Sequence, residues 1–73
     1  MRTKNKKRSS WALVAVKSFQ LETGLTKADG LDTAIADLLA DIRHLCDLKG
    51  FSYADLDRRA YLNYLPEVQG IDD

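Results

Sequence analysis

Apolar side chains recur every three or four positions between residues 31 and 49, and this is the clearest pattern in the chain. At about 100° per residue they fall within one stripe about 120° wide, which is typical of an amphipathic helix. The stripe comprises Leu31, Ile35, Leu38, Leu39, Ile42, Leu45 and Cys46, and the opposite side carries Asp37, Asp41, His44 and Asp47. We expect this helix to begin near Asp29 or Asp32, either of which can cap it, and to end near Lys49, before Gly50.

An earlier helix is predicted from Ser9 or Ser10 to about Thr23. A serine can cap its first turn, and Gly24 favours the left-handed conformation that ends many helices. Its apolar residues spread over a broad surface, which implies contacts on more than one side. They are Trp11, Ala12, Val14, Ala15, Val16 and Phe19. A strand over residues 11–16 is the alternative, because two of those residues are β-branched, but the alanines and the glycine favour helix.

A third helix is expected from about Tyr53 to Tyr64. Ser52 and Asp55 have the spacing of a capping box, and Pro66 opposes continuation. Its apolar stripe comprises Tyr53, Leu56, Ala60 and Tyr64, broadened by Tyr61, Leu62 and Leu65. The short link at Gly50 predicts an antiparallel helical hairpin, with the first helix covering its apolar seam. The sequence therefore predicts an all-α, three-helix fold with a single domain over residues 9–66.

Charge divides the chain unevenly although its net charge is zero. Five basic residues lie in the first eight positions, which leaves six basic against eleven acidic residues in the remainder. We therefore predict a disordered basic arm over residues 1–8 ahead of an acidic body. Residues 67–73 show no periodicity, and we expect a loose acidic tail there.

A domain of 73 residues buries only about 60% of its unfolded surface, so it needs additional stabilisation. One cysteine and one histidine permit neither an internal disulfide nor a four-ligand zinc site. We therefore expect self-association, as a homodimer, or a protein partner. Cys46 lies on the apolar stripe and is expected in the core. Its lone thiol favours the cytoplasm, and no apolar run reaches the ~20 residues that span a bilayer.

The acidic side of the second helix is the best candidate for chemistry. Asp37, Asp41 and His44 are spaced four and three residues apart, so their side chains can converge on one point and bind a divalent metal. A solvated helix face explains the same pattern without a metal. We favour the second interpretation and expect no enzyme activity and no cofactor, with a metal-dependent hydrolase as a remote alternative.

The segment from Asp37 to Asp47, followed by Gly50, Phe51 and Tyr64, resembles a family of short helical proteins from bacterial phages, plasmids and integrated elements. Those proteins read DLLxDLxHxxD, and a segment like residues 18–24 often precedes the motif. The resemblance covers residues 11–64, and Asn63 stands where the group often has histidine. It implies a mobile-element origin but no particular activity. Small acidic proteins of such elements often bind a larger host complex.

Two functions follow as hypotheses. The first is a non-enzymatic protein–protein interaction module that binds a host protein or complex, with inhibition as one mode of action. Its candidate partner-binding residues are Asp37, Asp41, His44, Asp47, Trp11 and Tyr61. The alternative is a nucleic-acid-associated protein, because basic side chains bind phosphate backbones. Its candidate residues form the basic arm: Arg2, Lys4, Lys6, Lys7 and Arg8.

Overall fold

The computed structural model describes residues 3–70 and consists of helices joined by short links. The elements are α1 (Thr3–Thr23), the short 3-10 helix η1 (Lys27–Asp29), α2 (Leu31–Lys49) and α3 (Tyr53–Gln69). Within the described residues there is no strand, so the predicted all-α class is confirmed. Residues 11–16 are helical, as expected.

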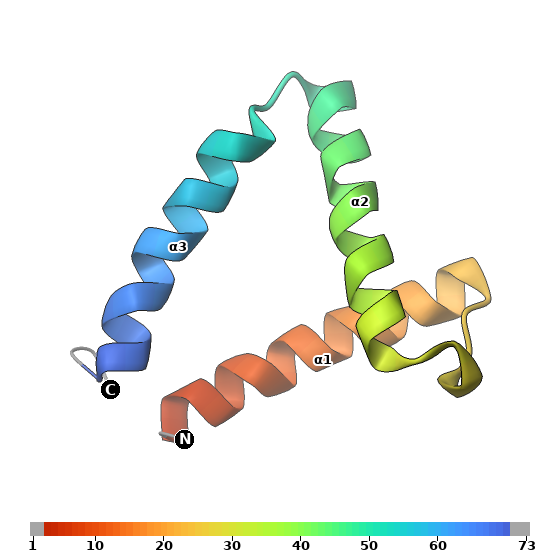
Figure 1. The fold of residues 1–73 in the computed structure, drawn as a ribbon, viewed down its shortest axis with the longest axis horizontal. Helices are drawn as coiled ribbons and strands as arrows, with labels where there is room; N and C mark the ends of the chain where they lie inside the picture. Colours follow the sequence, from red (N-terminus) through yellow and green to blue (C-terminus); the bar gives the residue numbers. More distant parts are fainter. Residues whose placement is uncertain (1–2, 71–73) are drawn as a thin grey trace.

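The three long helices form an open triangle in a single layer (Figure 1). The molecule measures 38 × 32 × 14 Å, and its shortest dimension is close to the 10–12 Å diameter of one helix with its side chains. The radius of gyration is 14.0 Å, whereas a compact chain of this length has a value of about 11 Å. Within residues 3–70, no second layer covers either face of the triangle.

Helix α1 begins at Thr3, so both the predicted start at Ser9 or Ser10 and the disordered arm are wrong. The hydroxyls of the two serines donate to the carbonyl of Lys6, at 2.8 and 3.0 Å, and lie inside the helix. Lysine and arginine are good helix formers, and no glycine or proline interrupts the basic segment. Residues 1 and 2 lie outside the described residues.

The predicted end of α1 is confirmed, because Gly24 has a φ of 78° and its N–H donates to the carbonyl of Gln20 at 2.9 Å. The expected cap of α2 by an aspartate is wrong. Asp29 closes a capping box around η1 instead, where its carboxylate accepts from the N–H of Thr26 at 2.7 Å. Gly30 occupies the N-cap position of α2 and provides no side-chain hydrogen bond.

The predicted turn at Gly50 and the predicted cap of α3 by Ser52 are confirmed, whereas the Asp55 side chain makes no return bond within the described residues to complete a capping box. Gly50 adopts the left-handed conformation with a φ of 74°, and Phe51 donates its N–H to the carbonyl of Cys46 at 2.9 Å. The hydroxyl of Ser52 accepts from the N–H of Asp55 at 3.2 Å. The two helices run in opposite directions from this link, but they diverge (Figure 1).

Helix α3 continues through Pro66 to Gln69, so its predicted end before the proline is wrong. Pro66 lies in the last turn, where its missing N–H removes only the bond to the carbonyl of Leu62. The expected loose tail is therefore helical over residues 67–69, and residues 71–73 lie outside the described part of the chain.

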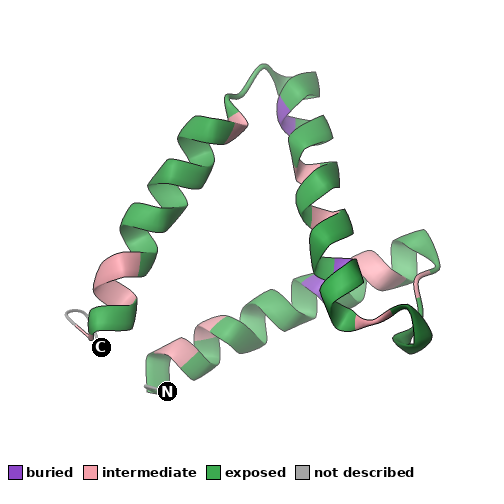
Figure 2. Cartoon of the chain, viewed as in Figure 1, coloured by how far each residue is buried: buried purple, intermediate pink, exposed green. Residues whose placement is uncertain are grey.

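Burial is confined to the corners of the triangle (Figure 2). Among residues 3–70 only Val16, Ala34 and Cys46 are buried, and α3 has no buried residue. The buried residue of α1 lies where this helix crosses the N-terminal part of α2. Helix α1 thus crosses one end of α2. The expectation that it covers a seam between α2 and α3 is wrong. Cys46 is buried, in agreement with the sequence analysis.

Candidate interaction surfaces

The protein exposes more total surface than a compact chain of its size, and large hydrophobic side chains are among the exposed residues. Its accessible surface is 5940 Å², whereas about 4,500 Å² is expected for a folded monomer of this mass, an excess of about 1,400 Å². Among residues 3–70, fifteen large hydrophobic side chains are exposed. The apolar stripe of α2 illustrates this, because Leu31, Ile35, Leu39 and Leu45 remain accessible.

Helix α1 carries apolar residues on the side opposite to its buried contact. At 100° per residue, Trp11, Val14 and Leu21 point away from Val16. Their exposed fractions are 67%, 65% and 85%, against 6% for Val16. Helix α1 thus has apolar residues on two sides, as predicted, but only the side of Val16 is covered.

Three basic residues of α1 share a hollow with the tryptophan. Lys4, Lys7, Arg8 and Trp11 line a hollow of about 270 Å³. Lys6 is exposed on the same helix, and Arg2 lies outside the described residues. The basic candidates are therefore held on a helix, next to an aromatic side chain, at its N-terminal end.

A polar corner joins this end of α1 to the end of α3. Arg8 Nε forms an ion pair with Glu67 Oε2 at 2.8 Å, and Asn5 Nδ2 donates to the backbone carbonyl of Glu67 at 2.9 Å. Arg8 Nη1 also donates to the amide oxygen of Asn5 at 2.8 Å. The sequence analysis missed this corner, because no local pattern relates residues that are 62 positions apart.

Two of the acidic candidates lie together at the α1–α2 crossing. Asp37 and Asp41 line a hollow of about 300 Å³ with Phe19 and Thr23 of α1. His44 and Asp47 are exposed further along α2. Residues 3–70 contain no group of three carboxylate, imidazole or thiol side chains placed to hold a metal ion.

Tyr61 lies on α3, where it is exposed and stacks on Tyr64 with ring centroids 6.4 Å apart. A second aromatic contact lies near the α2–α3 link, where the guanidinium of Arg43 is 4.2 Å from the ring centre of Tyr53. The predicted partner-binding residues thus occupy three helices. Asp37 and Asp41 share a hollow, whereas Trp11 and Tyr61 lie on other helices and do not join them in one site.

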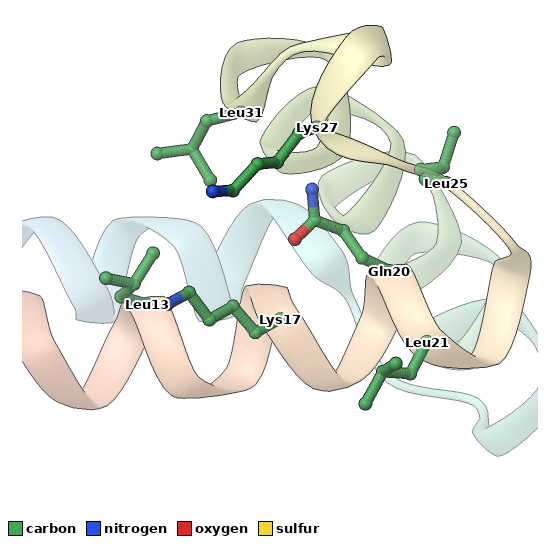
Figure 3. A pocket seen from close by; sticks show the side chains of 7 residues that line it. All are labelled: Leu13, Lys17, Gln20, Leu21, Leu25, Lys27 and Leu31. Atoms are coloured by element: carbon green, nitrogen blue, oxygen red, sulfur yellow. The ribbon is translucent and has the colours of Figure 1, made fainter.

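A further hollow was not predicted from the sequence. It has a volume of about 610 Å³ and lies between α1 and the segment that leads into α2 (Figure 3). Its lining comprises Leu13, Lys17, Gln20, Leu21, Leu25, Lys27 and Leu31. Four leucines make it mainly apolar, and the lining has two lysines but no carboxylate. The lining residues come from α1, from the link after it, from η1 and from the first position of α2, so sequence periodicity alone does not group them.

Fold and surface together define a small all-α protein whose three helices form an open triangle with exposed apolar sides. No helix within residues 3–70 has the length and apolar character needed to cross a bilayer. Comparison of the chain with protein-family models, curated proteins and solved structures finds no match. The resemblance to mobile-element proteins accordingly stays a prediction.

Proposed function

We propose that this protein is a non-enzymatic protein–protein interaction module. The observation that carries the proposal is the exposure of fifteen large hydrophobic side chains among residues 3–70, in a chain with about 1,400 Å² more accessible surface than a compact monomer. Contiguous exposed apolar surface is a mark of protein interaction sites. A single layer of helices gives these side chains no other covering within residues 3–70.

The aromatic pair on α3 supplies suitable anchors for a partner. Tyr61 and Tyr64 are each more than half exposed, and tyrosine is enriched among residues that dominate binding energy. On α2, Asp37, Asp41 and Asp47 add negative charge, which favours a partner with basic side chains. The resemblance described above suggests a host protein or complex as the partner, with inhibition as the mode of action. The lone buried thiol of Cys46 favours a cytoplasmic location.

Affinity capture from a bacterial lysate tests this function. The immobilised chain is expected to retain a host protein in stoichiometric amount, and Tyr61→Ala combined with Tyr64→Ala should lower its recovery at least about tenfold, as loss of a binding anchor does. Leu62→Ala is the matched control, because Leu62 is equally exposed but projects from another side of α3. If no host protein is retained, or if both variants lose it equally, the proposal is wrong.

A second candidate function is nucleic-acid binding through α1. The specific observation in its favour is that Lys4, Lys7 and Arg8 line one hollow with Trp11. Binding to duplex DNA should weaken with salt, and replacing Lys4, Lys6 and Lys7 by glutamine should reduce the logarithmic salt slope by about 0.9 for each lost phosphate contact. An absence of binding at low salt contradicts this candidate.

A further inference from the structure

We propose that α1 packs against α1 of a second copy of this chain, with the two helices antiparallel. The contact surface is the outer stripe of α1, which we define as Lys4, Lys7, Trp11, Val14, Ser18 and Leu21. This inference rests on the proposed function, because it treats an exposed apolar side as a binding surface and names one occupant for it.

The spacing of the outer stripe is that of a coiled-coil seam. Its positions alternate by three and four residues over the whole helix, as in a heptad repeat. Trp11, Val14 and Leu21 are the apolar members, and each is at least 65% exposed. The buried contact of α1 with α2 uses the opposite side, so a second helix can lie along the outer stripe without displacing α2.

The charges on α1 favour an antiparallel neighbour. Lys4, Lys6 and Lys7 lie near the helix N-terminus, where the macrodipole is already positive. The first turn has no acidic residue and the last turn has no basic one. An antiparallel second α1 places its C-terminal carbonyls and Glu22 beside this basic end, which relieves the repulsion. A parallel arrangement would bring two basic ends together.

When two antiparallel α1 helices overlap over their full length, each residue of the outer stripe lies opposite another residue of the stripe. We call each such pair a layer. Trp11 then lies opposite Val14 of the second copy, and Lys7 lies opposite Ser18 of the second copy. The small serine leaves room for the lysine stem, and the ammonium group stays at the solvated edge. Two-fold symmetry repeats each layer, as an isologous contact requires.

The chain as a whole exposes more surface than one interface of standard size would bury. A stable interface buries about 800 Å² on each partner, and this chain exposes about 1,400 Å² more than a compact monomer. The exposed hydrophobic residues of α2 and α3 are not part of the outer stripe of α1 and stay accessible to a different protein. The dimer and the host partner proposed above use different helices.

Solution mass is the first test. Light scattering on a size-exclusion column should give twice the chain mass of 8.2 kDa, and Val14→Glu should return the chain to a monomer or unfold it, as circular dichroism will distinguish. Leu48→Glu is the matched control, because Leu48 is 78% exposed on α2 and should leave the dimer intact. A monomer at every protein concentration overturns the inference, as does a dimer that survives Val14→Glu.

Disulfide trapping tests the orientation. In a Cys46→Ala background, chains carrying Lys7→Cys and chains carrying Ser18→Cys are mixed and oxidised, and the products are resolved by mass spectrometry. Antiparallel packing predicts a mixed disulfide between the two chains. Disulfides that join only two chains of the same variant would show parallel packing and overturn the proposal.

The two proposals fail in different ways. A monomer that retains a host protein through Tyr61 overturns the second copy and leaves the interaction function standing. A dimer that retains no host protein supports the second copy and overturns the interaction function. A monomer that binds duplex DNA through Lys4 and Lys7 overturns the dimer and favours the nucleic-acid alternative.

Discussion

Two corners of the triangle attach α1 to the rest of the chain by different kinds of contact. At the crossing with α2, Val16 is 6% exposed and Ala34 is fully buried. At the corner with α3, Arg8 and Glu67 form an ion pair whose side chains are 28% and 26% exposed. Apolar burial excludes water and is not screened by ions, whereas a partly solvated ion pair contributes at most about 1 kcal/mol and is screened.

This difference predicts an order of events when the chain is destabilised. The polar corner opens first, because water replaces its hydrogen bonds at little cost. The α1–α2 crossing persists longer, because separating it exposes apolar surface. Hydrogen exchange should therefore protect the amides around Ala34 more than those in the last turns of α3.

The largest effect is expected from overpacking the crossing. Ala34→Leu adds three carbon atoms where no space is accessible, and we expect the free energy of unfolding to fall by about 1–3 kcal/mol. Urea unfolding at one fixed protein concentration measures the change. Ala36→Leu is the control, because Ala36 is exposed on the same helix and its replacement should be nearly neutral. If the two variants are equally stable, the crossing is not closely packed.

An intermediate effect is expected at the remaining corner, between α2 and α3. Arg43→Gln removes the cation that lies 4.2 Å from the ring centre of Tyr53, and exposed contacts of this kind contribute about 0.5–1 kcal/mol. A double-mutant cycle with Tyr53→Leu isolates the contact by urea unfolding. Arg58→Gln serves as the control because Arg58 lies on exposed α3. A coupling energy of zero would contradict the prediction.

The sequence predicts the parts of this fold that are encoded locally. The end of α1 at Gly24, the end of α2 at Gly50 and the cap of α3 by Ser52 each depend on neighbouring residues, and all three are confirmed. The amphipathic pattern also places α2 within two residues of its observed bounds. Cap chemistry and periodicity act over one or two turns, so a single sequence contains the required information.

The corners depend on contacts between distant residues, and the sequence analysis missed them. The apolar stripe predicted for α2 omits Ala34, because a methyl group gives a weak hydrophobic signal, yet its small size lets α1 approach closely. The basic segment was expected to be disordered on charge alone, although its end is attached to Glu67. Trp11 and Tyr61 were predicted to bind a partner because they are aromatic. They lie on α1 and α3, and the open arrangement of these helices keeps them in separate places.

The smallest effect is expected at the polar corner and depends on salt. Glu67→Gln removes the ion pair with Arg8 but keeps the backbone carbonyl that accepts from Asn5. We expect the free energy of unfolding to fall by less than about 1 kcal/mol at low salt and by almost nothing at high salt, because ions screen partly solvated charges. Urea unfolding at both salt concentrations, with Asp57→Asn as the control, measures the difference. A loss of about 2 kcal/mol or more that persists at high salt would show that this corner stabilises the triangle as strongly as the apolar crossing does.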